Sequence, residues 1–451
     1  MSLFRRSVGV HPPYAKNTSG YTINELSGIP LVKIPVAMQI GPPPVVCVEV
    51  GQKVCVGELL AKPEAPLAVP VHSSVSGEIL EIKQEIQSSG RPCDVIVIKN
   101  DKRFTTHPDL KAPEINSKQD FLAAVRDSGT VGLGGAGFPT HIKLSPPPDK
   151  PIDILLVNGM ECEPFITSDE WLMRNHASEI IRALEKVLNY CEIPKALIGL
   201  EDNTPEAYAA MKEAVKASTF ANKIELHMVE ATYPQGAETV MISRLTGRKV
   251  PRGGLPFDVG CLVMNVGSLY SIDTYLQTGM PLVSRFLTLD GPALNRSGLY
   301  KVPIGTRISD LIEFSGGLAR VPEKVIMGGP MMGVAVSDLN SPVIKMNNSI
   351  LVLDHEMAQL PKEMACIHCG RCAKVCPVDL MPTELDRYAR EFKAEELQIF
   401  AVDTCIECGS CSFICPSKRY LLQNIRVGKQ IVRKYQNEQK AKAEAAAQDK
   451  K

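Results

Sequence analysis

Residues 366–377 read CIHCGRCAKVCP, and residues 405–416 repeat the cysteine pattern as CIECGSCSFICP. Both stretches follow the spacing C-x2-C-x2-C-x3-C, and a proline comes directly after the fourth cysteine. Three thiolates on one tight loop can hold three corners of a 4Fe–4S cubane, while the fourth cysteine reaches the other cluster. The spacing therefore predicts two clusters, one held by Cys366, Cys369, Cys372 and Cys415 and the second by Cys405, Cys408, Cys411 and Cys376.

Paired zinc ribbons are the alternative for these cysteines. Zinc sites use four ligands, often in C-x2-C pairs far apart, and a repeated set of four cysteines and a proline does not follow that pattern. We interpret His368 as a loop residue, because the cysteine set is complete without it. Between the motifs, residues 382–400 carry apolar residues at helical spacing, which predicts an α-helical ferredoxin domain over residues 346–428.

The composition excludes several classes of protein. The chain has 451 residues with 50 Lys+Arg against 50 Asp+Glu, and only 5% aromatic residues, which argues against nucleic-acid binding. No apolar run reaches ~18 residues and no apolar segment follows the N-terminal charges, so we expect neither a spanning helix nor a signal peptide. In the cytosol thiols stay reduced, so the 14 cysteines are not expected to form disulfides.

Residues 119–280 show the alternation of strands and helices that is typical of a Rossmann-like parallel sheet. Residues 152–157 form a short apolar run that fits a buried strand. Further strands are predicted at 196–200, 223–229 and 260–266, and helices at 169–190, 205–217 and 236–245.

A glycine-rich loop and an acidic loop are the candidate binding elements of this region. Residues 132–140 read GLGGAGFPT, and glycines at this density expose backbone amides to a phosphate. A plain glycine turn remains the alternative, since residues 121–128 before the loop look helical and a lone glycine fingerprint is weak. Residues 158–164 read NGMECEP and follow the strand at 152–157, at the edge where such sheets bind ligands. A capped turn before the next helix is the alternative for Glu161.

Shorter strands with glycine and proline flank the parallel sheet. Within residues 1–118, strands are predicted at 45–50, 54–60 and 78–82, and residues 70–77 read PVHSSVSG. This pattern resembles a lipoyl-type barrel-sandwich module, but it lacks the lysine hairpin that carries a cofactor. Residues 281–345 predict a small β domain. Residues 429–451 carry seven Lys/Arg against three acids and are predicted to be a flexible tail.

The order of these motifs resembles a known family. The glycine loop followed by NGMECEP is similar to the NADH-binding flavoprotein subunit of respiratory complex I. Together with the N-terminal module and the doubled cysteine motif, residues 4–425 resemble the RnfC subunit of the Rnf complex, an ion-translocating ferredoxin:NAD oxidoreductase of bacterial membranes. The resemblance implies that residues 281–345 form a β-grasp module of the soluble-ligand-binding (SLBB) type.

The resemblance also implies non-covalent FMN and bound NAD(H). It places Gly132, Gly134, Gly135 and Lys143 on the phosphate side, and it counts Gly137 of the same glycine loop among the cofactor-binding residues. It places Asn158, Glu161 and Asn265 against the flavin or its ribityl chain. The resemblance further implies that Phe138 and Glu163 face NADH and that Glu238 belongs to the nucleotide loop. The complex I loop has Arg where this chain has Leu133, and a Glu where it has Ala237.

The implied function is that of an electron-input or electron-output subunit. A flavin accepts hydride from NADH and releases single electrons, which the two clusters can pass to membrane and peripheral subunits of the complex. Ferredoxin would take part indirectly, and the chain would lie peripherally at the cytoplasmic face of the cell membrane. Two alternatives remain from the sequence: a soluble NADH-dependent donor to a reductase, and a relay or scaffold whose nucleotide site has decayed.

Overall fold

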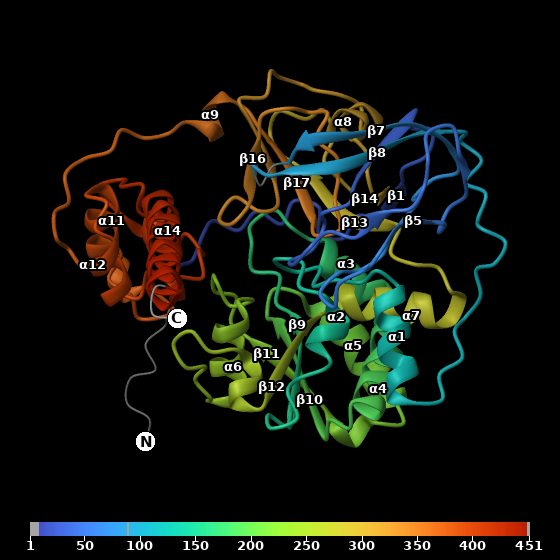
Figure 1. Cartoon of the computed structure of the whole chain (residues 1–451), viewed down its shortest axis with the longest axis horizontal. Helices are drawn as coiled ribbons and strands as arrows, with labels where there is room; N and C mark the ends of the chain where they lie inside the picture. The colour runs from blue at the N-terminus through green and yellow to red at the C-terminus, as the bar shows by residue number, and fades with distance from the viewer. Residues whose placement is uncertain (1–8, 88–89, 449–451) are drawn as a thin grey trace.

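The computed structural model describes residues 9–87 and 90–448. It arranges the chain in four regions: an N-terminal β region, a parallel sheet with helices, a second β region, and a helical region that carries the cysteine motifs (Figure 1). The helical region lies at one side of the molecule, next to the parallel sheet (Figure 1). The expected combination of α/β and β regions is confirmed.

The parallel sheet has four strands in the order β11-β10-β9-β12. They are β9 (Ile154–Gly159), β10 (Lys195–Glu201), β11 (Ile224–Val229) and β12 (Cys261–Asn265), so the four strands expected from apolar runs are confirmed. The chain moves outward from β9 to β11 and then returns to the other side of β9 as β12. The strand order therefore reverses between β9 and β12, and ligands of such sheets bind beyond the carboxyl ends at this point.

Helices cover both faces of this sheet. Buried side chains of one face pack against α1 (Lys118–Asp127), α4 (Ala177–Tyr190), α5 (Pro205–Ala217) and α7 (Val266–Thr278). The other face packs against α6 (Glu238–Thr246), with Leu156 and Val263 in contact with Met241 and Ile242. Because both faces are covered, β9, β10 and β12 are mainly apolar and buried, whereas the edge strand β11 carries Glu225 and His227 and is partly exposed.

The single helix expected over residues 169–190 is two helices, α3 (Ser168–Asn175) and α4. His176 separates them, with φ −130° and ψ 31°. Its ring packs against Trp171, Tyr270 and Phe286, which lie on α3, α7 and the second β region. The aromatic contacts come from distant parts of the chain, so helical periodicity alone did not reveal the break.

The N-terminal region contains two small sheets. One consists of β2 (Leu31–Pro35), β8 (Pro92–Asn100), β7 (Gly77–Ile86) and β4 (Lys53–Val54), and the other of β3 (Val45–Val46), β5 (Leu59–Lys62) and β6 (Val71–His72). The strands expected at 45–50 and 54–60 are much shorter than predicted. Gly51 and Gly57 have φ of 86° and 84°, and the turns they form interrupt the strands.

The second β region is a six-stranded sheet in the order β1-β14-β13-β17-β15-β16. Its strands are β1 (Ile23–Glu25), β13 (Ser284–Asp290), β14 (Gly298–Pro303), β15 (Lys324–Met327), β16 (Val334–Val336) and β17 (Ser349–Leu353), with the helix α8 (Ile308–Phe314). The sheet takes in β1 from the N-terminal stretch and β17 from beyond residue 345. Its buried residues share one core with the N-terminal sheets.

Lys345 ties this core to the glycine-rich loop. Its side chain is 1% exposed, and Nζ donates to the carbonyl oxygens of Pro70 at 2.9 Å and Gly129 at 2.8 Å. One buried amine thus connects three regions of the chain. Gly129 directly precedes the residues that lead into the loop, so the contact positions the loop.

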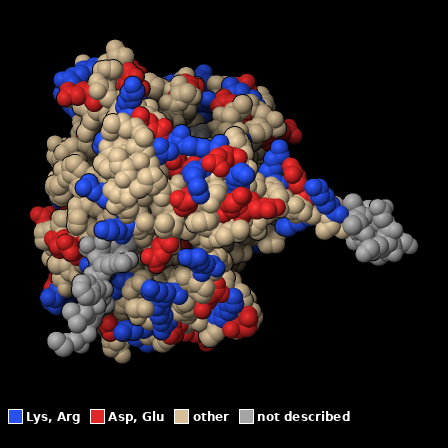
Figure 2. Space-filling view, turned by 90° about the vertical axis from the view of Figure 1, so that its left-hand side faces the viewer, with Lys and Arg blue, Asp and Glu red and all other residues tan. Residues whose placement is uncertain are grey.

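The cysteine region is helical. After α9 (His355–Ala358) it contains, in order, α10 (Arg371–Lys374), α11 (Pro382–Arg390), α12 (Ala394–Ile399), η3 (Val402–Thr404), α13 (Ser410–Ile414) and α14 (Leu421–Gln448). The short helices α2 (Thr140–Lys143), η1 (Ala221–Lys223) and η2 (Pro256–Val259) belong to the region of the parallel sheet. The helix expected over residues 382–400 breaks at Phe392, whose φ is 55°. Helix α14 continues to Gln448, and its described end projects from the body (Figure 2); residues 449–451 of the predicted tail lie outside the described residues.

Within the residues described, none of the helices has both the length and the apolar character needed to cross a bilayer.

Two glycines at helix ends provide a matched test of the packing around α7. Gly279 ends α7 with φ 75°, and a Cβ there would lie 2.2 Å from the carbonyl oxygen of Lys111. Gly247 ends α6 with φ 73°, and a Cβ there would meet nothing within 4 Å. Gly247→Ala is expected to cost about 1 kcal/mol for the left-handed conformation. Gly279→Ala is expected to cost roughly 1–3 kcal/mol more, because backbone must also move. Thermal unfolding of both variants measures the difference, and equal losses would contradict it.

Candidate functional site

Asn158 and Asn265 meet at the carboxyl edge of the parallel sheet. They are register partners on the adjacent strands β9 and β12. Nδ2 of Asn158 donates to the carbonyl oxygen of Gly236 at 2.7 Å, and Nδ2 of Asn265 donates to Asp169 at 2.7 Å. Oδ1 of Asn265 accepts the N–H of Gly267 at 2.8 Å. Both amides are thus held in fixed orientations at the point where the strand order reverses.

The glycine-rich loop closes over this edge. A Cβ on Gly134 would lie 2.7 Å from Nδ2 of Asn265, so the loop can approach the strand end only with glycine there. A Cβ on Gly135 would meet nothing within 4 Å, and its backbone faces open space. The N–H of Gly132 donates to the carbonyl oxygen of Phe138 at 2.9 Å, which closes the loop, and Gly137 adopts φ 73°. Phe138 is partly buried.

Lys143 and Glu238 lie side by side at the same edge. Nζ of Lys143 donates to Oε1 of Glu238 at 2.5 Å and to the carbonyl oxygen of Val263 at 3.0 Å. The pair joins α2, which follows the glycine loop, to the start of α6. The structure therefore brings together two of the predicted residues that are 95 positions apart in sequence.

Glu161 caps the helix that follows it. Its carboxylate accepts from the backbone N–H groups of Asp169 at 2.9 Å and Glu170 at 3.2 Å and from Oγ of Ser168 at 3.2 Å. These donors form the amino end of α3, which attracts negative charge. These contacts match the capped turn that the sequence offered as the alternative for Glu161. Burial still raises its pKa to about 7.

Glu163 connects the acidic loop to the second β region. Its carboxylate accepts from the N–H groups of Met331 at 3.0 Å and Met332 at 2.8 Å. A Cβ on Gly329 would fall 2.2 Å from Oε2 of Glu163, so the turn before Met331 needs a glycine to let the carboxylate in. Burial raises the pKa of Glu163 to about 7.

Lys16 and Glu201 also belong to this site, although sequence reasoning missed both. Glu201 ends β10 and is 2% exposed, and its Oε1 has no hydrogen-bond partner among the residues described. Burial raises the pKa of Glu201 to about 7, and the charge of Lys16 opposes that rise. Lys16 opposes it in the same way at Glu161, Glu163 and Asp169. Its Nζ donates to the carbonyl oxygens of Glu161 and Ile166 at 2.5 Å.

The position of Glu201 at a strand's carboxyl end was a usable signal, but nothing in the sequence pointed to Lys16. One amine surrounded by buried carboxylates with raised pKa values is typical of a functional site.

The second cysteine motif contacts the sheet region directly. Oη of Tyr233, which is 1% exposed, donates to the carbonyl oxygen of Cys408 at 2.6 Å. Cys162 and Met331 pack in the same buried cluster. Sγ of Cys162 accepts the N–H of Gly236 at 3.4 Å, and burial raises the pKa of this thiol, which makes it a poor nucleophile. A structural role for Cys162 fits these contacts.

The cysteines gather in the two sets expected from their spacing. Cys366, Cys369, Cys372 and Cys415 line one small cavity next to Arg419. The four thiols of the other set also lie close together. Burial raises the pKa of Cys411, and the neighbouring thiols of Cys408, Cys405 and Cys376 raise it further. In both sets the fourth sulfur comes from the other motif, as a two-cluster arrangement requires.

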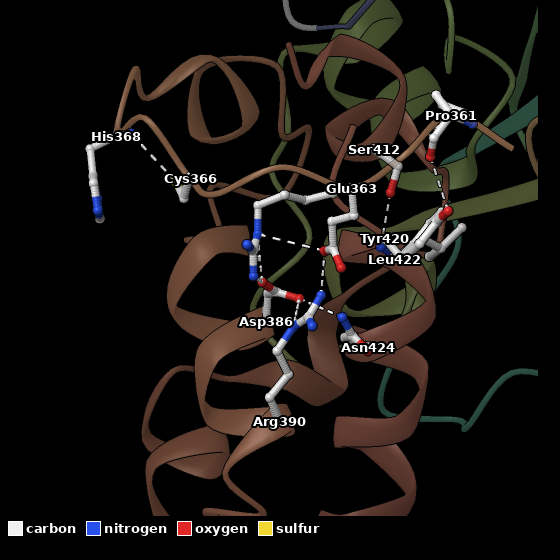
Figure 3. Close-up of polar contacts among 11 residues, drawn as sticks. Pro361, Glu363, Cys366, His368, Asp386, Arg390, Ser412, Tyr420, Leu422 and Asn424 are labelled. Carbon is white, nitrogen blue, oxygen red and sulfur yellow. Dashed lines mark hydrogen bonds and ion pairs between the residues drawn. The ribbon is translucent and has the colours of Figure 1, made fainter. Parts of the chain in front are cut away.

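A buried carboxylate holds the helices around the first set. Asp386 on α11 is 1% exposed and accepts from Arg390 at 3.0 Å, Arg419 at 3.0 Å and Asn424 at 2.5 Å. Figure 3 shows Arg390 and Asn424 pointing toward Asp386, with Glu363 beside Arg390. The backbone N–H of His368 donates to Sγ of Cys366 at 3.4 Å, while its ring points away (Figure 3).

The donor sets fit the two kinds of cofactor expected. The amide pair, the glycine cradle and the orphan carboxylate oxygen suit a polar, hydrogen-bonding ligand such as FMN at the sheet edge. Two groups of four thiols suit 4Fe–4S clusters, because thiolates are the ligands that such clusters prefer.

Family comparisons agree with this division of the chain. Residues 4–103 match the RnfC barrel sandwich hybrid domain, and residues 125–274 match the Nuo51 FMN-binding domain. Residues 286–335 match the SLBB domain, and residues 365–420 match a 4Fe–4S dicluster domain, which favours clusters over zinc ribbons. An FMN-binding domain joined to a dicluster domain defines a flavin and iron–sulfur oxidoreductase subunit.

Curated relatives specify the family. The chain is 39% identical over 428 residues to the RnfC-type subunit of the Na(+)-translocating ferredoxin:NAD(+) oxidoreductase complex of Acetobacterium woodii, covering 94% of this chain and 96% of that protein. It is 39% identical to the corresponding subunit of the proton-translocating complex of Clostridium ljungdahlii, covering 84% and 82%. The chain belongs to the RnfC family of ion-translocating oxidoreductase (Rnf) complexes, so it is one subunit of a multi-subunit complex.

A solved structure supports the fold alone. The NAD+-reducing [NiFe]-hydrogenase in the air-oxidized state aligns with a TM-score of 0.50 at 18% identity, covering 68% of this chain and 63% of that chain.

The buried carboxylate of Glu201 predicts a pH dependence of the stability of the protein. With a folded pKa of about 7 for Glu201 and an unfolded value of about 4.3, the folded chain binds more protons between these values. The free energy of unfolding should therefore fall as the pH rises from about 4.5 to 7. Glu201→Gln in flavin-depleted protein should flatten part of this fall and raise stability at pH 8 by on the order of 1–3 kcal/mol. Denaturant unfolding at four pH values measures it. Glu206→Gln, at an exposed position, is the control, and identical pH profiles would refute the assignment.

Single cysteine variants test the two ligand sets. Cys369→Ala should remove the cluster of the first set and retain the second, while Cys408→Ala should do the reverse. Iron and sulfide analysis should show about half the content in each variant, because each cluster needs its four thiolates. Cys47→Ala, an exposed cysteine outside both sets, is the control. Retention of both clusters in either variant would overturn the assignment.

Proposed function

We propose that this chain exchanges hydride with NADH at a bound FMN and passes single electrons through two 4Fe–4S clusters to other subunits of a membrane ion-translocating ferredoxin:NAD oxidoreductase. The membrane subunits couple this transfer to ion transport, and ferredoxin exchanges electrons with them rather than with this chain. The chain acts as a peripheral subunit at the cytoplasmic face of the membrane. The observation that carries the proposal is the contact between the sheet region and the second cysteine motif.

The side chains at the sheet edge have separable tasks in this proposal. Asn158 and Asn265 present oriented amides to the flavin and its ribityl chain. The backbone of Gly132, Gly134 and Gly135 lies against the phosphate, with Lys143 nearby. Bound FMN supplies the conversion between two-electron hydride transfer and one-electron transfer.

Glu163 holds the loop of Met331 and Met332 against the acidic loop, and so positions the wall next to which NADH would lie. We assign Phe138 and Glu238 to the same proposed nucleotide site. Lys16 offsets the charge of the buried carboxylates, which keeps the edge from repelling anionic cofactors. With both cofactors bound, hydride transfer would require no acid–base pair from these residues.

The contacts support one order of electron transfer through the two clusters. Cys408, whose carbonyl oxygen accepts from Tyr233, belongs to the set with Cys376, so this cluster lies next to the flavin domain. The other set faces outward: Cys369 is exposed, and the side chain of Ile367 beside it is 66% exposed. Electrons from NADH would therefore reach the cluster of Cys408 first and leave through the cluster of Cys366 and Cys369.

Anaerobic reduction by NADH tests both the function and the order. In Cys369→Ala, NADH should bleach the flavin and reduce the remaining cluster at a rate close to that of the unaltered chain. In Cys408→Ala, NADH should still bleach the flavin, but the remaining cluster should be reduced at least tenfold more slowly, because its relay is missing. Stopped-flow absorbance follows the flavin, and freeze-quenched EPR follows the clusters.

Dithionite should reduce the remaining cluster in both variants, which serves as the control for cluster integrity. Absence of flavin bleaching with both clusters intact would refute the NADH reaction. The reverse ranking of the two variants would refute the order alone.

A further inference from the structure

A second cavity lies beside the carboxyl edge of the parallel sheet, and Ser168, Asp169 and Gly267 border it. Its volume is about 380 Å³, which is in the range of small-molecule sites. Residues of α3, α7, the N-terminal β region and strands β13 and β14 line it. The ion pair of Glu25 and Lys301, at 3.1 Å, lies at its exposed rim.

Arg285 also lines this cavity. The residue is 5% exposed, and Nε donates to the carbonyl oxygen of Asn347 at 3.1 Å. Among residues 9–87 and 90–448, neither terminal nitrogen of its guanidinium group makes a hydrogen bond or a salt bridge. Burial lowers the pKa of Arg285 to about 10. The guanidinium is thus desolvated with the charge of Asp169 as partial compensation, and a bound anion would offset more of that cost.

The amino end of α7 faces the same space. Gly267 lies in its first turn, and the position that a Cβ would take there is 3.6 Å from Nη1 of Arg285 and 3.7 Å from Oδ1 of Asp169. The absence of a side chain thus leaves room between the guanidinium, the carboxylate and the helix end. The amino end of a helix carries a partial positive charge, which adds to that of Arg285.

We propose that Arg285 and the amino end of α7 bind the oxyanion of a phosphate- or carboxylate-bearing ligand in this cavity. The nearby carboxylate of Asp169 selects for a hydroxyl group beside that oxyanion, because only a donor satisfies it. The apolar wall of Leu133, Leu172 and Phe286 accepts the remainder of the ligand.

Two sources could supply this oxyanion. One is the phosphate of FMN itself, since Asp169 and Gly267 both contact Asn265 and Leu133 lines the cavity. In that case Arg285, on β13 of the second β region, supplies the positive charge that the complex I loop has at the position of Leu133. The other source is a separate small phosphate or carboxylate that enters past Lys301. The proposal is independent of NADH oxidation, because binding is measured without electron transfer.

Equilibrium binding to the full, flavin-depleted chain distinguishes the sources. FMN and riboflavin, which differ by the phosphate, are titrated by fluorescence, and inorganic phosphate is tested by its effect on thermal unfolding. If the oxyanion belongs to FMN, Arg285→Gln should weaken FMN binding roughly ten- to a hundredfold and leave riboflavin binding unchanged. If it is separate, phosphate should raise the melting temperature of the unaltered chain but not of Arg285→Gln, while FMN binding stays the same.

Two further variants make the result unambiguous. Arg296→Gln removes the same charge from an exposed position on the β13–β14 connection and should behave like the unaltered chain. Arg285→Lys keeps the charge and should restore part of the lost binding. Without ligand, Arg285→Gln should change the melting temperature little, because it removes a buried charge but also the charge that offsets the buried Asp169. A lower melting temperature together with unchanged binding of FMN and phosphate would overturn the proposal and leave Arg285 a structural residue.

Discussion

The pairing of β9 with β10 on one side and β12 on the other is the constraint on which the candidate site depends. Parallel strands end at the same edge, so the reversal of strand order beside β9 leaves a crevice there. Asn158 and Asn265 come from segments more than a hundred residues apart, yet the register places them opposite each other. The glycine loop approaches this pair only because Gly134 has no side chain.

The other regions are attached to this edge by a few buried polar contacts. Lys345 joins the N-terminal β region, the second β region and the start of the glycine loop. Glu163 reaches the second β region, and Tyr233 reaches the cysteine region. Each contact pairs a side chain with backbone groups, so it fixes a position in space without demanding a particular partner residue. The shared apolar core of the two β regions supplies the larger part of the stabilisation.

Much of the architecture could be predicted from local patterns. Strands β9, β10 and β12 were visible as mainly apolar runs, because strands covered on both faces need no polar alternation. The cysteine sets followed from the doubled motif, because three closely spaced thiolates hold one cubane and the fourth ligand comes from the other motif. The breaks at His176 and Phe392 were missed, since periodicity continues across them. Strands β1 and β17 were missed as parts of the second β sheet, since their partners are distant in the chain.

The sequence by itself determined the ligand chemistry of this protein: eight thiols in two motifs, a glycine cradle, and amide and carboxylate groups after apolar strands. Those properties are local, because they depend on residue type and short spacing. Only the tertiary structure decided which cluster lies next to the flavin domain, that Glu161 caps α3, that Lys16 sits among buried carboxylates, and that Arg285 borders a second cavity. These facts depend on contacts between distant segments, and chain folding brings such segments together through burial and register that no single stretch encodes.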